Sequence, residues 1–219
     1  MLGQGFVVPE RIKLEGRYAR LEPLDLEQHG EALLASAQAP GALDRFRYLT
    51  DPPPETADHF TRWLAPAAAS EDPLFHAVVD RATGRAEGRQ ALLRIDARNG
   101  VIEVGGILWG PAIARTRIAT EALFLAACYV FDRLGYRRLE WKCDARNEAS
   151  RRAARRFGFT YEGLFRQHMI VKGENRDTAW FAILDHEWSW LRPRYEDWLN
   201  PPNFDDAGRQ RARLDVERR

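Results

Sequence analysis

Basic and hydroxyl side chains gather in the stretch Gly110–Glu121, between a predicted strand and a predicted helix. A loop that leads from a strand into a helix points several backbone N–H groups, and the positive end of the helix dipole, at one place. Arg115 and Arg117 add positive charge there, and Thr120 is placed to cap the helix or to donate its hydroxyl to a phosphate oxygen. These residues indicate an anion site suited to a pyrophosphate. A plain strand-to-helix loop with a threonine cap explains them as well.

A second polar group opens a later helix. Asn147 has the side chain of a helix N-cap, and Ser150 is the first-turn residue that completes a capping pattern. The same helix carries four arginines that we expect to lie largely on its outer face, available to solvent or to a phosphate group: Arg151, Arg152, Arg155 and Arg156.

The spacing of apolar residues predicts the elements that must position these groups. The first half predicts helices at 26–37 and 55–64 and strands at 17–24, 74–80, 90–95 and 101–109, the last three as an antiparallel meander. The second half predicts helices at 119–134 and 147–157 and strands at 138–144, 160–171 and 177–184. This order predicts an α/β core with parallel middle strands and an antiparallel hairpin at the edge. Beyond Trp188 we expect a short helix near 194–199 and a loose, charged tail without a part in the chemistry.

Composition limits the classes of partner. The 219 residues include 33 Lys and Arg against 32 Asp and Glu, a net charge of +1, so no overall field is available to bind nucleic acid or an anionic membrane. Cys128 and Cys143 form no CxxC pair, and His76 and His186 have no neighbours at metal-ligand spacing, so we predict no metal site. No stretch approaches a membrane span or the apolar region of a signal peptide, and we expect a soluble, cytoplasmic protein.

Taken together, the motifs resemble the GNAT superfamily of acyl-CoA-dependent N-acyltransferases, and in particular its RimJ/RimL-type branch. The likeness runs from the strand near residue 74 to Trp188, and the strand at 17–24 fits the opening strand of that branch. It rests on Glu103-Val104-Gly105, Trp109-Gly110-Pro111, Arg115 to Glu121, Asn147-x-x-Ser150 and Gly158-Phe159-x-x-Glu162-Gly163. The resemblance implies a GNAT fold: a mixed, mostly antiparallel sheet with central splayed parallel strands, flanked by helices. It also implies one catalytic domain over residues 1–188, with 189–219 as a C-terminal extension.

The resemblance implies that acetyl-CoA, the co-substrate, lies where two parallel strands splay, here 101–109 and 138–144. The residues expected at its pyrophosphate are Arg115, Thr116, Arg117, Ile118, Ala119 and Thr120, mainly through backbone N–H groups. Asn147 is expected to contact the pantetheine arm or the neighbouring backbone.

Two proton transfers accompany attack of an amine on a thioester. By the match to the motif, Ser150 is expected to protonate the departing thiolate. Glu103, in the splayed strand, is the preferred general base, directly or through water, with a solvated strand carboxylate as the alternative. Tyr161 and Glu162 are weaker candidates for these roles. His168 is a further candidate base, although an ordinary edge-strand histidine explains it better.

One position departs from the family pattern. The pyrophosphate loop of the family runs Q/R-x-x-G-x-G/A, and we match it to Arg115–Thr120, where Arg115 and Ala119 fit and Ile118 replaces the first glycine. A side chain at that place either restricts the close approach of the backbone to the pyrophosphate or faces inward with the loop conformation kept.

The sequence therefore predicts an acetyl-CoA-dependent N-acetyltransferase that acts on a primary amine, either a protein N-terminus or a small molecule. The alternative, motivated by Ile118, is an acyl-CoA-binding module of the same fold with little or no turnover. The expected partners are acetyl-CoA and an amine acceptor, without nucleic acid or membrane. A homodimer is a further possibility, to which the apolar segment 188–191 contributes.

Overall fold

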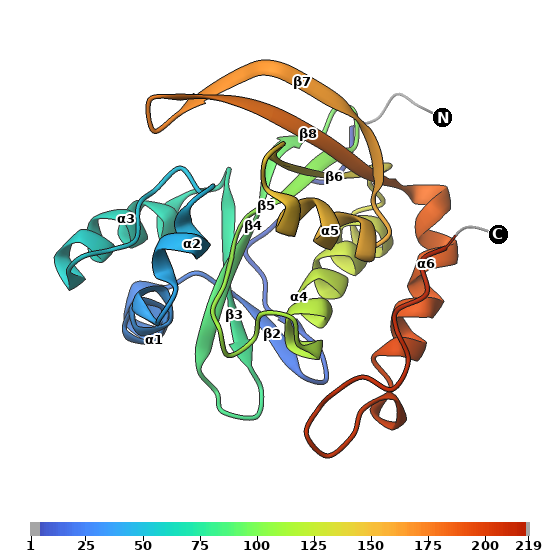
Figure 1. Cartoon of the computed structure of the whole chain (residues 1–219). Helices are drawn as coiled ribbons and strands as arrows, with labels where there is room; N and C mark the ends of the chain where they lie inside the picture. The colour runs from blue at the N-terminus through green and yellow to red at the C-terminus, as the bar shows by residue number, and fades with distance from the viewer. Residues whose placement is uncertain (1–4, 218–219) are drawn as a thin grey trace.

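An eight-stranded sheet runs through the computed structural model, which describes residues 5–217 (Figure 1). The strand order is β1-β2-β3-β4-β5-β6-β8-β7. The strands are β1 (Leu14–Glu15), β2 (Ala19–Pro23), β3 (Leu74–Asp80), β4 (Ala86–Asp96), β5 (Val101–Trp109), β6 (Arg138–Asp144), β7 (Thr160–Val171) and β8 (Glu174–Leu184). All neighbouring pairs are antiparallel except β5 and β6, which are parallel. The predicted fold class, a mostly antiparallel sheet with a central parallel pair, is confirmed.

Helices cover both faces of the sheet (Figure 1). The helices are α1 (Leu26–Gln38), α2 (Ala42–Phe46), α3 (Ala57–Ala69), α4 (Arg117–Cys128), α5 (Glu148–Arg156) and α6 (Asp185–Trp198), with a π-helical turn η1 (Tyr129–Arg133) and a 3-10 turn η2 (Pro201–Asn203). The first three lie on one side of the sheet and α4, α5 and α6 on the other. We call these the α1–α3 face and the α4–α6 face. β1 and α2 were not predicted, and the predicted helix at 119–134 is an α-helix from Arg117 that ends in the π-helical turn.

The two parallel strands are paired over only a short length. β5 and β6 align at Val101↔Arg138, Ile102↔Leu139 and Glu103↔Glu140, and no later pair joins them within residues 5–217. Further along β5, one extra residue opposes β4 between Gly105 and Leu108. Gly106 lies in this bulge with φ +58°, a backbone conformation that favours glycine. The carboxyl-terminal halves of β5 and β6 therefore diverge.

Alternation along these strands assigns side chains to the two faces. Ile102 and Val104 of β5, with Leu139 and Trp141 of β6, belong to the core cluster that also contains Leu123 of α4. The intervening residues, including Glu103, consequently project toward the α1–α3 face. The chain thus places charged side chains of both parallel strands on one face and apolar side chains on the other.

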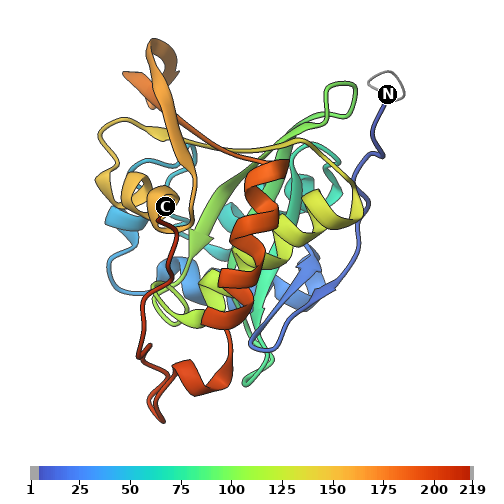
Figure 2. The ribbon, with the colours of Figure 1, turned by 90° about the vertical axis from the view of Figure 1, so that its right-hand side faces the viewer.

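The C-terminal region is an ordered part of the fold, contrary to the prediction of a short helix and a loose tail. α6 begins at Asp185, so it is longer than predicted and contains the expected domain boundary at residue 188. Figure 2 shows α6 crossing the helical face, followed by a segment that folds back beneath it. Asn203 fastens this segment, since its Nδ2 donates to the Trp198 carbonyl at 2.9 Å and its Oδ1 accepts from Ala212 N at 2.8 Å. Leu214 is buried.

Candidate active site

Thr116, and not Thr120, caps α4. The Thr116 hydroxyl accepts a hydrogen bond from the backbone N–H of Ile118 at 3.1 Å and donates to the Ile113 carbonyl at 2.7 Å. Thr120 is buried, and its hydroxyl donates to the Thr116 carbonyl at 3.3 Å. The Thr120 side chain is therefore engaged inside the protein, and its predicted capping role is wrong.

The first turn of α4 leaves backbone donors without protein partners. Among residues 5–217, the N–H groups of Arg115, Arg117 and Ala119 donate no hydrogen bond, whereas Thr120 N reaches the Thr116 carbonyl at 3.4 Å. The exposed Arg115 has φ +64°, which turns the chain into the helix. Unpaired N–H groups at a helix N-terminus are the arrangement that favours an anionic ligand.

Ile118 faces inward. Its side chain packs against the small core cluster that contains Ala19 and Leu21 of β2. The family pattern Q/R-x-x-G-x-G/A fits this loop in two ways: with Arg115 first, the glycine position is Ile118, and with Ala119 last, the glycine position is Arg117 and the Q/R position is Ala114.

Asn147 and Ser150 lie at the start of α5, as predicted. Asn147 Oδ1 accepts from Ser150 N at 3.0 Å, which makes Asn147 the N-cap. The Ser150 hydroxyl accepts from Trp141 Nε1 at 2.9 Å and is also hydrogen-bonded to the nearby Cys143 thiol. Since Trp141 and Cys143 belong to the buried side of β6, Ser150 lies on the α4–α6 face next to the diverging strand.

Glu103 lies on the opposite face in a chain of ion pairs. Its Oε2 is 2.6 Å from Arg94 Nη1 and 3.1 Å from Lys142 Nζ, and the same Nζ is 2.7 Å from Glu140 Oε2. Glu140 in turn contacts Arg138 Nε at 2.8 Å. Only 4% of Glu103 is exposed, so the alternative of a solvated strand carboxylate does not hold.

Burial raises the pKa of Glu103 above its ordinary value, although Lys142 and Arg94 oppose the shift. A carboxylate with a raised pKa is a better proton acceptor than an ordinary glutamate. Lys142 and Arg94 were missed by the sequence reasoning. The alternating charges at Arg138, Glu140 and Lys142 were the available signal, because residues two apart in a strand share a face.

His168 belongs to the same face. Its Nδ1 is 2.9 Å from the Thr178 hydroxyl, and its ring lies 5.5 Å from Phe165 and 6.0 Å from Trp180 between ring centroids. The Trp180 ring also carries Lys142 Nζ at 3.7 Å from its centroid. Burial and three nearby cations, from Arg176, Arg94 and Lys142, lower the pKa of His168. The hairpin of β7 and β8 thus brings a neutral imidazole toward the Glu103 network.

The two weaker candidates lie at different levels of the parallel pair. Glu162 is bound by Arg138, with Nη1 to Oε1 at 2.8 Å, and Arg138 is the first residue of β6, so Glu162 is at the paired end of the strands. Tyr161 packs edge-on against Phe181 and is level, through Phe181, with Trp141, the first residue of β6 beyond the paired positions.

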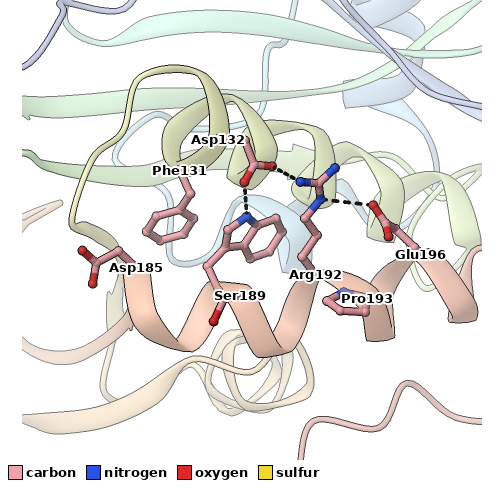
Figure 3. A pocket seen from close by; sticks show the side chains of 8 residues that line it. Phe131, Asp132, Asp185, Ser189, Arg192, Pro193 and Glu196 are labelled. Carbon is pink, nitrogen blue, oxygen red and sulfur yellow. Dashed lines mark hydrogen bonds and ion pairs between the residues drawn. The ribbon is translucent and has the colours of Figure 1, made fainter.

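A surface hollow of about 500 Å³ lies elsewhere, between η1 and α6 (Figure 3). Arg192 crosses it between Asp132 and Glu196, at 3.5 and 3.1 Å. Trp188 Nε1 donates to Asp132 at 2.9 Å. None of its lining residues comes from β5, β6 or the first turn of α4, so the hollow is separate from the candidate site.

The remaining titratable groups show no second centre. His76 is buried, and desolvation lowers its pKa to about 4, as for a neutral core histidine. Within residues 5–217, no cluster of His, Cys, Asp and Glu side chains is arranged to hold a metal ion. In the same range, every helix is too short or too polar to cross a membrane.

Comparisons with known proteins agree with this geometry. The family model described as "Acetyltransferase (GNAT) domain" matches residues 19–160. A GCN5-related N-acetyltransferase from Brucella melitensis has 56% identity and a TM-score of 0.95, and the match covers 96% of this chain and 95% of that one. A probable acetyltransferase of the GNAT family from Chromobacterium violaceum has 40% identity and a TM-score of 0.79, over 85% and 92% of the two chains. No curated protein matches.

A putative ribosomal-protein-serine acetyltransferase from Vibrio cholerae shares the fold at 19% identity, with a TM-score of 0.68 over 79% of this chain and 97% of that one. At this identity the likeness concerns the fold alone. The family model, by contrast, spans most of the chain, and the diverging parallel strands followed by a capped helix are its structural counterpart. The chain belongs to the GNAT acetyltransferase family.

Proposed function

We propose that this protein is an N-acetyltransferase that transfers the acetyl group of acetyl-CoA to a primary amine. The family implies acyl transfer from acetyl-CoA. The observation that carries the proposal is the divergence of β5 and β6, with unpaired backbone donors on the α4–α6 side and Glu103 on the other. A thioester held in the gap is accessible to an acceptor from the α1–α3 face.

The residues on the α4–α6 side fit the co-substrate. The N–H groups of Arg115, Arg117 and Ala119 would bind the pyrophosphate, with Thr116 keeping the helix end in place. Asn147 is engaged as the N-cap of α5 through its Oδ1, which supports a contact to the pantetheine arm through its amide group or the adjacent backbone. Ile118 faces the core and supports the loop. Thr120, whose N–H and hydroxyl both donate to the Thr116 carbonyl, would support the helix start and not contact the pyrophosphate.

Glu103 and Ser150 are proposed as the two proton-transfer groups. The attacking ammonium loses a proton to Glu103, directly or through water, and the free amine forms the new N–C bond while the C–S bond breaks. The nitrogen then releases its second proton to solvent and becomes a neutral amide. The Ser150 hydroxyl donates its proton to the departing thiolate, and solvent reprotonates Ser150. Lys142 and Arg94 hold the Glu103 carboxylate in place. His168 is the alternative base, since its pKa is lowered and it faces the same charged network.

Several finer points of the prediction belong to this proposal. The RimJ/RimL-type branch is supported by the motif around Asn147 and Ser150. A cytoplasmic location and a homodimer are carried as parts of the same proposal. The catalytic domain, expected over residues 1–188, is proposed to continue beyond residue 188, because α6 runs without a break from Asp185 to Trp198. The acceptor itself is defined only as a primary amine, because the region around α2 and the β7–β8 turn, where Lys172 Nζ donates to the Phe46 carbonyl at 2.9 Å, carries mixed charge.

The second candidate, a module that binds acyl-CoA without turnover, is weakened by two findings. Its motive was Ile118, which packs inward. In addition, Glu103 is buried and its pKa is raised, as a general base requires.

Calorimetric titration of the protein with acetyl-CoA, followed by a screen of amines for CoA release, tests the proposal. We expect micromolar binding and thiol release that depends on the acceptor. Binding without release with any amine class would favour the module, and the absence of binding would overturn both functions.

A further inference from the structure

Arg117, the first residue of α4, is held between two aromatic rings. Its guanidinium carbon lies 4.2 Å from the Tyr18 ring centroid and 5.2 Å from that of Phe204. Tyr18 precedes β2, whereas Phe204 belongs to the C-terminal extension. A guanidinium on an aromatic face is attracted by the ring quadrupole and loses freedom to move. The first residue of α4 therefore has a side chain fixed by a segment 87 positions further along the chain, from 117 to 204.

Arg156 is held in the same way. Its guanidinium carbon lies 5.1 Å from the Trp198 ring centroid, and its Nη1 donates to the Thr120 hydroxyl at 3.2 Å. Thr120 belongs to the first turn of α4, so Arg156 reaches from the end of α5 to the same helix terminus as Arg117. The expectation that Arg156 points outward is wrong, because it is half-buried against the extension.

Neither arginine has an acidic partner among residues 5–217. Arg138, Arg146 and Arg192 each contact a carboxylate, whereas Arg194, stacked on Trp190, has no ion pair within the described residues and so resembles Arg117 and Arg156 in this respect. A partly buried cation without a counter-charge is costly, and two such cations beside the positive end of a helix dipole add to one another. An anionic ligand would relieve this cost.

Contacts within the extension hold the Trp198 and Phe204 rings in place. Trp198 and Phe204 meet edge to face, with centroids 5.1 Å apart. Trp198 Nε1 donates to Gln210 Oε1 at 3.1 Å, and the Tyr18 hydroxyl donates to the Leu199 carbonyl at 3.1 Å. At Gly208, where φ is +73°, the position of a Cβ would be 3.8 Å from the Arg117 guanidinium carbon. The extension thus closes around Arg117.

We propose that the C-terminal extension, residues 198–214, is part of the donor site, where Phe204 and Trp198 position Arg117 and Arg156 to bind the phosphate groups of the acyl-CoA. This inference rests on the proposed function. Phe204 and Trp198 act as positioning residues, because they touch the arginines and not the ligand. Arg117 supplies a fixed charge at the first turn of α4.

The test measures CoA binding by calorimetry, with full-length protein, at about 50 and 300 mM NaCl, where screening differs strongly. Arg117→Met, at a partly exposed position, is expected to weaken binding about tenfold, as for loss of one charge-assisted contact. Phe204→Leu keeps the charge but removes the ring, and we expect about fivefold weaker binding. Phe204→Tyr is expected to restore the affinity. Both weakened variants should show a smaller change in affinity with salt than the wild type.

Trp190→Leu is the matched control, because Trp190 carries Arg194 at 3.8 Å on the same α6 helix, away from α4. We expect wild-type binding and salt dependence from this variant. Equal CoA affinity and salt dependence for wild type, Arg117→Met and Phe204→Leu would overturn the inference while leaving the proposed function intact. If the wild type itself binds no CoA, the proposed function fails, and the inference fails with it.

Discussion

Charged groups near the diverging strands are paired on one face of the sheet and unpaired on the other. On the α1–α3 face, Glu103 and Glu140 share Lys142, and each has an arginine as well. On the α4–α6 face, the N–H groups at the start of α4 have no partners among the described residues, and Arg117 and Arg156 have no carboxylate. The charges around Glu103 are paired with one another, whereas those at the start of α4 are not paired within the described residues.

Because of this difference, the structure indicates more about the acyl donor than about the acceptor. Unpaired donors and cations specify the chemistry of a missing ligand, so the donor side indicates a phosphate-bearing molecule. The network around Glu103, whose charges are already paired with one another, gives no such indication of the chemistry of an acceptor. The acceptor therefore remains a primary amine of undefined structure.

Replacing Lys142 should give the largest effect on stability, because Lys142 is the cation that Glu103 and Glu140 share. Lys142→Met leaves Glu103 and Glu140 directly opposite each other in the β5–β6 register, without the cation between them. We expect a loss of about 3 kcal/mol in the free energy of unfolding, measured with urea. Lys172→Met, at an exposed lysine, is the control and should cost well under that. A small effect at Lys142 would mean that the network is not what joins β5 and β6 on this face.

Replacing Glu103 distinguishes a working group from a purely structural one on this face. Glu103→Gln should lower kcat about hundredfold at neutral pH, as for loss of a general base. Because burial raises the pKa of Glu103 above its ordinary value of 4.5, the rate of the wild type should rise with pH above that value, and the variant should lose this rise. The pH–rate profile of His168→Gln is measured in parallel. If only Glu103→Gln loses the rise in rate with pH, Glu103 is the base; if only His168→Gln loses it, His168 is the base.

Replacing Ser150 tests whether the other face takes part in chemistry as well as binding. Ser150→Ala removes the hydroxyl that accepts from Trp141 Nε1. We expect kcat to fall about tenfold, less than for a typical acid, because a thiolate with a pKa near 8.5 leaves readily without a proton. Acetyl-CoA affinity should stay nearly unchanged. Wild-type turnover across the pH range would reduce Ser150 to a first-turn residue of α5.

The smallest effect compares two helix caps, one on each face. Thr116 caps α4, and Thr56 caps α3 by accepting from His59 N at 3.1 Å. Thr116→Ala and Thr56→Ala should each cost about 1 kcal/mol in the free energy of unfolding. Only Thr116→Ala should also weaken acetyl-CoA binding. Equal binding by both variants would contradict the role assigned to the first turn of α4.

Regular elements were predictable where apolar periodicity continues to the end of the element. The strands at 74–80, 101–109, 138–144 and 160–171 match the structure. Failures occur where long-range packing decides the outcome. α2 has only five residues, too few for a helical pattern, and α6 contains Pro193, which hid a helix that Trp188 and Tyr195 anchor in the core.

The site was predictable as a set of positions but not as a set of contacts. Asn147 and Thr116 are adjacent in sequence to the helices they cap, so local reasoning found the right loops. The Glu103–Lys142 pair and the Arg117–Phe204 contact join segments that are distant in sequence. Because such contacts depend on strand register and on the path of the C-terminal segment, no local pattern revealed them.

The short pairing of β5 and β6 has a mechanical consequence. Three residue pairs join the five strands β1–β5 to the three strands β6, β8 and β7. The sheet therefore consists of two parts with only a short paired region between them. A molecule that forms hydrogen bonds with the backbone of both diverging strands would bridge them where they are no longer paired with each other. If acetyl-CoA lies in the gap as proposed, it would also join the two parts of the sheet and make the sheet stiffer.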